Sequence, residues 1–235
     1  MILLSIIIPV YNSEKTISRT LVSLNRMSRK SKELTEVIIV DDGSQDRSPE
    51  IVELRKETLL PLTVVLIRQE NQGSAGARNT GLEHSSGEWI FFLDADDELA
   101  FDPIPYIQKS PDYSALGFTI QWYKKLKKWR VLRTILVNLE KHLDICTASV
   151  PFSLSNIVFK KDRINSVFDE RFLYLEDWVF WIQNPSIFEN MKVYKNIISA
   201  HIYAHGENKS SNYMILGIYR KKIADEMLST LCEKL

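Results

Sequence analysis

The first hundred residues alternate between short apolar runs and longer amphipathic segments, and this alternation restricts the fold more than any other feature. The apolar runs, rich in Ile and Val, lie at residues 4–9, 36–40, 62–67 and 88–93. Segments with helical spacing of apolar residues separate them, at residues 14–25, 48–56 and 75–84. Strands alternating with helices are typical of βαβ units. The sequence therefore predicts an α/β fold with a Rossmann-like, mainly parallel central sheet flanked by helices.

Beyond residue 100 the pattern is looser but still mixed. Strands are predicted at residues 113–122, 129–137, 155–159 and 191–203, the first two forming a hairpin around the basic turn at 124–128. Helical spacing is present at residues 177–184 and 213–235. Because neither an internal repeat nor a Pro/Gly linker interrupts the chain, we expect a single domain over residues 1–235.

Composition narrows the class of protein. With 235 residues, 45% of them apolar, the chain can bury one sizeable core. Its 30 basic residues balance 30 acidic ones, so no global field attracts nucleic acid, and we expect no nucleic-acid partner. Two cysteines suit a reducing compartment such as the cytoplasm. Residues 3–10 are too few to span a bilayer, which takes about 20 residues, so any membrane contact is expected to be peripheral.

Carboxylates follow two of the predicted strands at the point where each ends. Asp41 and Asp42 follow the second strand, and Asp94, Asp96 and Asp97 follow the fourth. In an open α/β sheet, ligands bind at the carboxyl ends of the strands, so these loops should converge. Clustered carboxylates without nearby Cys or His pairs favour Mg²⁺ or Mn²⁺, which bridge carboxylates to phosphates. The alternative is a solvated acidic turn.

Four short motifs in a fixed order carry a resemblance to a known family. They are IIIPVYN at residues 6–12, VDDGS at 40–44, NQG with ARN and a glycine at 71–81, and LDADD at 93–97. The chain resembles the inverting family 2 glycosyltransferases with the GT-A fold, closely over the first hundred residues. The segment LEDW at residues 175–178 is similar to the family's Glu-Asp motif. The resemblance implies a nucleotide-sugar-binding half at 1–100 and an acceptor-binding half with a C-terminal helix at 101–235.

The resemblance implies a donor-binding role for residues of the first half. Pro9 and Tyr11 would border the nucleobase, and Asp42 would accept a hydrogen bond from a uracil ring nitrogen. Arg78 would face the diphosphate or the donor sugar. A similar position near the diphosphate, on a looser match, is expected for His205.

The resemblance also implies the metal and catalytic residues. Asp96 would bind Mn²⁺ or Mg²⁺, and Asp94 would hold the ribose or assist the metal. Asp177 would be the catalytic base, with Glu176 and Trp178 on the acceptor side. These roles agree with inverting transfer, in which one group removes the acceptor proton and a metal stabilises the leaving diphosphate. Whether burial raises or the helix N-terminus lowers the pKa of Asp177 stays open here.

Each of these residues also has a plain structural interpretation. Asp177 would merely cap its helix, and Asp41 and Asp42 would form an Asx-turn. Arg78 would be a solvated helix residue paired with Glu83. For single residues this interpretation is reasonable, but it does not account for the whole ordered set.

A basic aromatic segment at residues 122–133 has three interpretations. It interleaves Trp122, Tyr123 and Trp129 with six basic residues, a composition suited to an anionic leaflet. A solvated hairpin tip has the same composition. Nucleic-acid binding, the third interpretation, is disfavoured by the neutral overall charge. The peripheral association with the inner face of the cell membrane therefore stays open at this stage.

Together these features predict a metal-dependent enzyme that moves one hexosyl or N-acetylhexosaminyl group, with inversion, from a nucleotide sugar. A UDP-sugar donor, a glycan or lipid-linked acceptor and a role in bacterial surface polysaccharide synthesis are expected from the resemblance. One alternative is a nucleotidyltransferase, which would carry a Gly-rich basic loop where residues 10–16 have only Lys15. Another is a catalytically silent nucleotide-sugar-binding scaffold. The donor sugar, the acceptor and the oligomeric state are not specified by the sequence.

Overall fold

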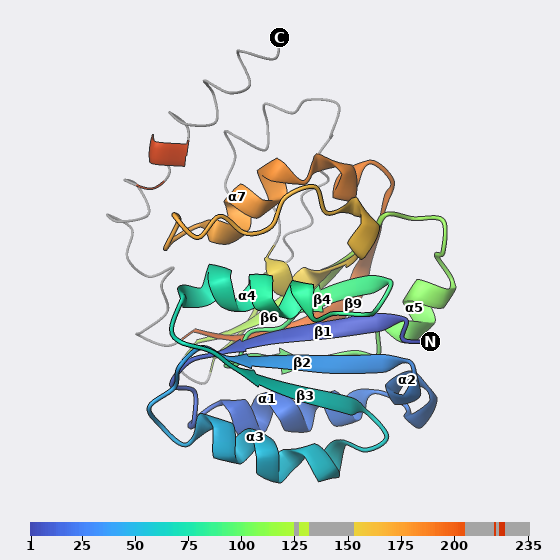
Figure 1. The fold of residues 1–235 in the computed structure, drawn as a ribbon. Coiled ribbons are helices and arrows are strands. Elements are labelled where there is room, and N and C mark those ends of the chain that lie inside the picture. Colours follow the sequence, from blue (N-terminus) through green and yellow to red (C-terminus); the bar gives the residue numbers. More distant parts are fainter. Residues whose placement is uncertain (125–126, 132–152, 205–218, 220, 224–235) are drawn as a thin grey trace.

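The computed structural model describes residues 1–124, 127–131, 153–204, 219 and 221–223 (Figure 1). The strands are β1 (Leu4–Val10), β2 (Thr35–Asp41), β3 (Thr63–Arg68), β4 (Trp89–Phe92), β5 (Glu98–Leu99), β6 (Ala115–Lys124), β7 (Lys127–Val131), β8 (Ile157–Lys160) and β9 (Met191–Ala204). The α-helices are α1 (Ile17–Ser23), α2 (Arg29–Glu33), α3 (Ser48–Lys56), α4 (Gly73–Glu83), α5 (Ile104–Gln108) and α7 (Glu176–Gln183). Short 3₁₀ turns are η1 (Leu24–Arg26), η2 (Glu57–Leu59), η3 (Leu154–Asn156), η4 (Lys161–Arg163) and η5 (Pro185–Phe188).

Within the described residues the strands form one nine-stranded sheet in the order β3-β2-β1-β4-β8-β6-β9-β5, with β7 paired to β6. Strands β3, β2, β1 and β4 are parallel, as the βαβ pattern predicts. Strand β8 runs antiparallel between β4 and β6, so a strand from the second half of the chain extends the sheet of the first half. The mainly parallel α/β architecture predicted for the first hundred residues is confirmed.

Helices cover both faces of this sheet. Figure 1 shows α1 and α3 on one face and α4 and α7 on the other. Alternate residues of β1 serve the two layers: Ile6 and Ile8 pack with α1, whereas Ile7 lies in a second cluster with residues of α4 and α7. Every residue of β2 is buried, which explains its continuous apolar run, since a strand covered on both faces needs no polar side.

The predicted elements of the first half are confirmed, with shifts of a few residues at several ends; α4, for example, begins at Gly73 rather than at residue 75. Helix α3 has the predicted bounds, whereas α1 begins at Ile17 rather than at residue 14. The reason is a pair of contacts between loops: the backbone N–H of Ser13 donates to Ser48 Oγ at 2.8 Å, and that of Glu14 donates to Asp46 Oδ2 at 2.9 Å. These bonds hold the chain beside the start of α3 before α1 can begin.

In the second half, the predicted hairpin is confirmed where it is described, with Trp122 opposite Trp129 in the antiparallel pair β6 and β7. The turn at residues 125–126 and most of the predicted helix at 213–235 lie outside the described residues. The single domain over 1–235 therefore stays a prediction. Among the described residues, every helix is too short or too polar to cross a membrane.

Candidate active site

The loops that follow β1 and β2 are bound to each other at the carboxyl edge of the sheet. The backbone N–H of Asn12 donates to Ser44 Oγ at 3.0 Å, and Asn12 Oδ1 accepts from the backbone N–H of Gln45 at 2.8 Å. Two residues predicted to contact a nucleobase lie here. Pro9 is partly buried in β1, and Tyr11 is exposed in the loop that follows.

The two carboxylates after β2 have different partners. Buried Asp41 accepts from the backbone N–H of Ser44 and pairs with Arg68 Nε, each at 3.2 Å. The bond from Ser44 makes a local turn at Asp41, as in the Asx-turn that the sequence offered as the purely structural alternative for this residue. Asp42 instead points to the start of α4, where it accepts from Gln69 Nε2 and from the backbone N–H groups of Gln72 and Gly73.

All three of these Asp42 bonds measure 2.8 Å. They satisfy N–H groups at the beginning of α4 and place a negative charge at the positive end of the helix dipole. A carboxylate offers about four acceptor positions, so these bonds leave Asp42 capacity for one further donor. Asp42 also fixes α4 relative to β2 through its bonds to Gln72 and Gly73.

Arg78, on α4, is buried between two carboxylates that come from distant parts of the chain. Its Nη1 donates to Glu176 Oε1 and its Nη2 to Asp94 Oδ1, both at 2.9 Å. Burial disfavours the charged guanidinium, but the two carboxylates outweigh burial and raise the pKa of Arg78 above its ordinary value. The interpretation of Arg78 as a solvated partner of Glu83 is therefore wrong.

Ser74, one helical turn before Arg78, completes this contact. Its hydroxyl donates to the same Glu176 Oε1 at 2.7 Å. Residues four apart on a helix share a face, so α4 presents two donors to one carboxylate. The sequence gives no signal for Ser74, because its partner is 102 residues away.

Asp177 is half-buried beside this pair, at the start of α7. Its Oδ1 accepts from the backbone N–H of Trp178 at 2.9 Å. Burial first and then the negative charge of Glu176 raise the pKa of Asp177 to about 7, against smaller opposing effects of Arg78 and the Trp178 N–H. The sequence left the direction of the Asp177 pKa shift open, and the structure shows that the pKa is raised. The residue that caps α7 is Leu175, at φ 60°, so Asp177 is not the helix cap.

Two side chains predicted on the acceptor side are buried. Glu176 contacts Arg78 and Ser74 as described, and Trp178 packs in a cluster with Phe172, Val179 and Ile223. Their acceptor-binding role stays a prediction.

The loop after β4 gathers three carboxylates. Oxygen atoms of Asp94, Asp96 and Asp97 lie within 4.8 Å of one another. Asp97 is buried and accepts from the backbone N–H of Tyr203 at 3.2 Å; burial, then the charges of Asp94 and Asp96, raise its pKa well above the ordinary value. A set made only of carboxylate oxygens fits a hard divalent cation such as Mg²⁺ or Mn²⁺. The sequence prediction included Asp94 and Asp96 as ligands, and the structure adds Asp97 to the cluster.

Four of the predicted residues, Asp42, Arg78, Asp94 and Glu176, therefore meet around α4. Asp42 binds the start of α4, and Arg78 of the same helix joins Asp94 of the metal-type cluster to Glu176, the neighbour of Asp177. His205 lies outside the described residues.

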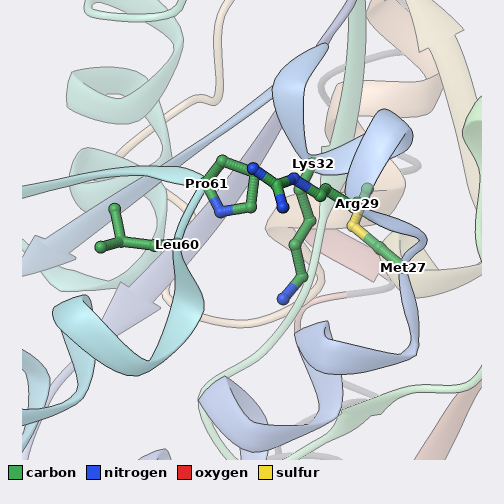
Figure 2. Close-up of a pocket in the computed structure, with 5 residues that line it drawn as sticks. All are labelled: Met27, Arg29, Lys32, Leu60 and Pro61. Carbon is green, nitrogen blue, oxygen red and sulfur yellow. The ribbon is translucent and has the colours of Figure 1, made fainter.

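Figure 2 shows a pocket of about 380 Å³ whose lining contains none of these carboxylates. It is lined by Met27, Arg29, Lys32, Leu60 and Pro61. Its two cations already have partners in the protein, because Lys32 donates to Asn25 Oδ1 and Arg29 pairs with Glu33. None of the predicted site residues lines this pocket, so it does not belong to the candidate site.

Comparison with known proteins places these features in a family. The model of "Glycosyl transferase family 2" matches residues 5–136. The amylovoran biosynthesis glycosyltransferase AmsE of Erwinia amylovora is 29% identical over 190 residues, which cover 78% of this chain and 70% of AmsE. The minor teichoic acid biosynthesis protein GgaA of Bacillus subtilis is 43% identical over 98 residues, covering 41% of this chain but only 22% of GgaA. The chain thus spans a small part of some of its relatives.

Solved structures share the fold. The structure of S. aureus TarS 1–349 in complex with UDP-GlcNAc matches with a TM-score of 0.72 and 21% identity, over 90% of this chain and 61% of that one. The mannosyltransferase PcManGT from Pyrobaculum calidifontis, in complex with GDP-Man and Mn²⁺, matches with a TM-score of 0.62 and 19% identity, over 88% of this chain and 59% of that one. At these identities the likeness concerns the fold alone.

Proposed function

This chain belongs to glycosyl transferase family 2 and has the GT-A fold, and on that premise we propose that it transfers one sugar from a nucleotide sugar to an acceptor hydroxyl, with inversion at the anomeric carbon. The observation that carries the proposal is the Arg78 bridge. One buried guanidinium holds Asp94, from the cluster suited to a metal, and Glu176, whose neighbour Asp177 has a pKa suited to a base.

The donor is proposed to bind along the loops after β1, β2 and β4. Pro9 and Tyr11 would contact the nucleobase, and Asp42 would use its remaining acceptor capacity for a uracil ring N–H. Arg78 would offer positive potential to the diphosphate while keeping its two carboxylates. The TarS complex contains UDP-GlcNAc and the PcManGT complex contains GDP-Man, so nucleotide sugars bind to this fold. We favour a UDP-sugar because Asp42 matches the acceptor that uracil needs.

A divalent cation is proposed to be held by Asp94 and Asp96, with Asp97 beside them. Mn²⁺ is present in the PcManGT complex, and the oxygen-only donor set suits Mn²⁺ or Mg²⁺ equally. When bound, such an ion supplies Lewis-acid stabilisation of the leaving diphosphate.

Asp177 is proposed to remove the proton of the acceptor hydroxyl. The proton goes to the Asp177 carboxylate, the acceptor oxygen forms a bond to the anomeric carbon, and the bond from that carbon to the phosphate oxygen breaks. The electron pair of that bond leaves with the nucleoside diphosphate. A base with a pKa of about 7 is half ionised near neutral pH, where general base catalysis is efficient, with a typical gain of about 10²–10⁴ in rate.

Glu176 and Trp178 are buried, and we propose that they hold Asp177 in position, in addition to or in place of the predicted acceptor contact. The acceptor is proposed to be a glycan or lipid-linked saccharide of a bacterial surface polysaccharide. The support comes from the relatives, which include biosynthesis proteins for amylovoran and teichoic acid and an undecaprenyl-phosphate 4-deoxy-4-formamido-L-arabinose transferase. With such an acceptor the enzyme would work at the cytoplasmic face of the membrane.

The proposal is tested with Asp177→Asn. Wild type with Mn²⁺ and a panel of nucleotide sugars should be stabilised against heat by one donor and should hydrolyse it slowly. Asp177→Asn should bind that donor with unchanged affinity and lose at least a hundredfold in turnover. Asp162→Asn, an exposed carboxylate on η4, is the matched control and should behave as wild type.

Three results would contradict this proposal in different ways. Normal turnover by Asp177→Asn would remove Asp177 from the mechanism. Donor binding by wild type without hydrolysis or transfer to any acceptor would favour the scaffold alternative. Release of pyrophosphate from a nucleoside triphosphate and a sugar phosphate would favour the nucleotidyltransferase alternative.

A further inference from the structure

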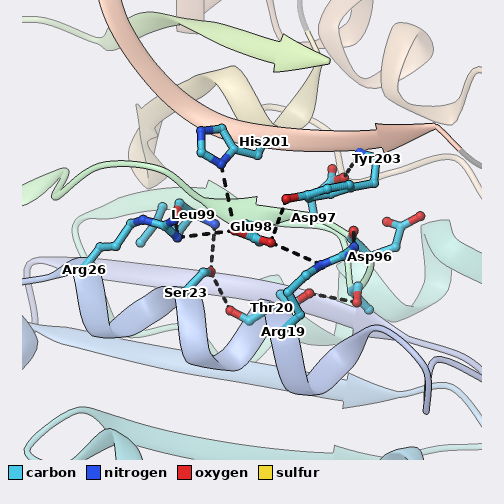
Figure 3. Close-up of polar contacts among 11 residues, drawn as sticks. Arg19, Thr20, Ser23, Arg26, Asp96, Asp97, Glu98, Leu99, His201 and Tyr203 are labelled. Carbon is cyan, nitrogen blue, oxygen red and sulfur yellow. Dashed lines mark hydrogen bonds and ion pairs between the residues drawn. The ribbon is translucent and has the colours of Figure 1, made fainter. Parts of the chain in front are cut away.

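Arg19 is on α1, which covers the face of the sheet opposite to α4 (Figure 1), and it reaches the carboxylate-bearing loop (Figure 3). We use "carboxylate loop" for residues 94–97. Arg19 Nη2 donates to the backbone carbonyl of Asp96 at 2.6 Å, and Arg19 Nε lies 3.3 Å from Glu98 Oε1. The guanidinium carbon also lies 3.8 Å from the centre of the Tyr203 ring. One side chain therefore contacts the carboxylate loop, the strand that follows it and the end of β9.

Glu98 and Tyr203, which Arg19 contacts outside the carboxylate loop, are also bonded to each other. The Tyr203 hydroxyl donates to Glu98 Oε1 at 2.8 Å, and the Tyr203 backbone N–H donates to Asp97 Oδ1. Burial, then Glu98, raise the pKa of Tyr203 to about 12, so its hydroxyl remains a donor at neutral pH. The orientation of Asp97 thus depends on the position of Tyr203, which is stacked under Arg19 and bonded to Glu98.

Such anchoring has a physical purpose at this position. Three carboxylates within 4.8 Å repel one another, so contacts with other parts of the protein must oppose that repulsion. Arg78 binds the side chain of Asp94 and the Tyr203 N–H binds the side chain of Asp97, whereas other contacts hold the backbone of the loop. Helix α1 supplies two of these contacts, because Thr20 Oγ1 donates to the carbonyl of Ala95 at 2.9 Å beside the Arg19 bond to Asp96.

We propose that Arg19 is a positioning residue that holds the carboxylate loop in the arrangement that binds the divalent cation. The inference rests on the proposed function for the identity of the ion, but it concerns the chain's own residues. Burial and the charges of Asp94 and Asp96 raise the pKa of Asp97, and the positive charge of Arg19 partly opposes that rise. The positioning effect of Arg19 is expected through the loop backbone and Tyr203.

Arg26 provides a matched control on the same face of the protein. It also pairs with Glu98, at 3.5 Å, and also donates to a backbone carbonyl, at 2.9 Å. The side chains of Arg19 and Arg26 are 39% and 42% exposed, so their replacement removes the same charge from side chains of similar exposure that share Glu98 as a partner. The difference is the acceptor, which is Asp96 in the carboxylate loop for Arg19 and Leu99 beyond it for Arg26.

The test compares Arg19→Met, Arg19→Lys and Arg26→Met in the full chain. Mn²⁺ affinity is measured without donor by calorimetry or by the electron paramagnetic resonance of free Mn²⁺, and thermal unfolding is measured in parallel. Residues that orient metal ligands typically contribute about 10–100-fold to metal affinity. We expect Arg19→Met to weaken Mn²⁺ binding at least tenfold and Arg26→Met to stay within about twofold of wild type. Arg19→Lys, with its charge but without the planar fork, should be intermediate.

A kinetic measurement adds a second readout. With the donor identified, Arg19→Met should raise the Mn²⁺ concentration needed for half-maximal rate more than it lowers the rate at saturating Mn²⁺. Equal Mn²⁺ affinity in Arg19→Met and wild type would overturn the inference, as would equal weakening by Arg26→Met. If Arg19→Met does not fold, Arg19→Lys with wild-type affinity has the same meaning.

Failure of the proposed function gives a different pattern. Wild type that binds Mn²⁺ but no nucleotide sugar would contradict the function and leave the role of Arg19 intact. Wild type that binds neither Mn²⁺ nor Mg²⁺ would overturn the inference as well, because the carboxylate loop would then have no cation to hold.

Discussion

Replacement of Arg78 by Met should cost the protein a large part of its stability, in a way that depends on Glu176. In wild type the buried guanidinium neutralises two carboxylates at 2.9 Å each. Arg78→Met keeps a side chain of similar length but removes the positive charge beside Glu176, whose side chain is only 11% exposed. The bond from the Ser74 hydroxyl to Glu176 Oε1 stays in place, but this donor is neutral. Asp94 is 39% exposed, so water can replace much of what it loses.

The expected size of the effect comes mainly from Glu176. Removal of one partner of a buried ion pair typically costs about 3–5 kcal/mol, because a charge stays buried without compensation. Since Asp94 is partly solvated, we expect the low end of that range, about 3 kcal/mol. In a chain of this size a change of 1 kcal/mol shifts the Tm by about 2–4 °C, which predicts a drop of roughly 6–12 °C.

The dependence on pH has a definite sign. Without Arg78, the folded-state pKa of Glu176 should lie above its unfolded-state value, so the folded protein binds the extra proton more readily. Stability of the variant relative to wild type is then gained as the pH falls from the folded-state pKa to the lower unfolded-state pKa, and it is lost again as the pH rises through that window. The deficit should be clearly smaller at pH 5 than at pH 8.

Urea unfolding followed by tryptophan fluorescence measures these differences. The double variant Arg78→Met/Glu176→Gln removes the buried charge and should recover most of the lost free energy. Arg29→Met, which breaks an exposed pair with Glu33, is the matched control and should cost less than about 1 kcal/mol. A loss below about 1 kcal/mol for Arg78→Met, or a double variant no more stable than the single one, would refute the reasoning about the buried pair.

Two further predictions concern the catalytic and donor sides of the site. The transfer rate at saturating Mn²⁺ should fall as the pH drops below about 7, because only ionised Asp177 accepts a proton. Glu176→Gln removes a negative charge that raises the pKa of Asp177, so this fall in rate should occur at lower pH in the variant. A fall in rate at higher pH in Glu176→Gln would contradict the assignment. Asp42→Asn should lower the free energy of unfolding in urea by about 1–3 kcal/mol, because the amide NH₂ would face a backbone N–H of Gln72 or Gly73. The same variant should bind UDP more weakly without a change in Mn²⁺ affinity. UDP affinity equal to wild type would argue against Asp42 as the uracil acceptor.

The sheet and most helices of the first half could be predicted because their signals are local. The apolar run of β1 is buried from Leu4 to Ile8 and pairs with equally apolar neighbours on both sides. Helix α3 starts with Pro49 in its first turn and has its predicted bounds. The ends of strands, and hence the edge where the carboxylates lie, follow from the same periodicity.

The partners of the site residues could not be predicted in the same way, because they are set by topology. Arg78 and Glu176 are 98 residues apart, and Asp97 and Tyr203 are 106 apart. Nothing in the residues around Arg19 distinguishes it from Arg26, yet only Arg19 reaches the carboxylate loop. Charge and periodicity predicted carboxylates at the strand ends, and the family resemblance implied roles for individual residues. The contacts that orient these residues appear only once β9 and α7 are placed beside α1 and α4.

The three residues of the ARN motif on α4 show why one short helix can assemble this site. Ala77 packs against Ile38 and Val40 of β2, which fixes the helix against that strand. Arg78, next in sequence, turns to the two carboxylates. Asn79 then donates to the carbonyl and accepts from the N–H of Phe168, which ties α4 to the segment that leads to α7.

Gly81 makes this arrangement close enough to work. A Cβ at this position would lie 2.3 Å from Ile7 Cγ2, so only a glycine lets α4 approach β1 to its present depth. Because Arg78 is one turn earlier on the same helix, its distance from Asp94 at the end of β4 depends on that approach. A bulkier residue would push α4 outward, and the guanidinium could then no longer bind Asp94 and Glu176 together. Gly81 and Arg78 therefore act together, since the glycine sets the depth of α4 at which the arginine joins Asp94 to Glu176, the neighbour of the proposed base.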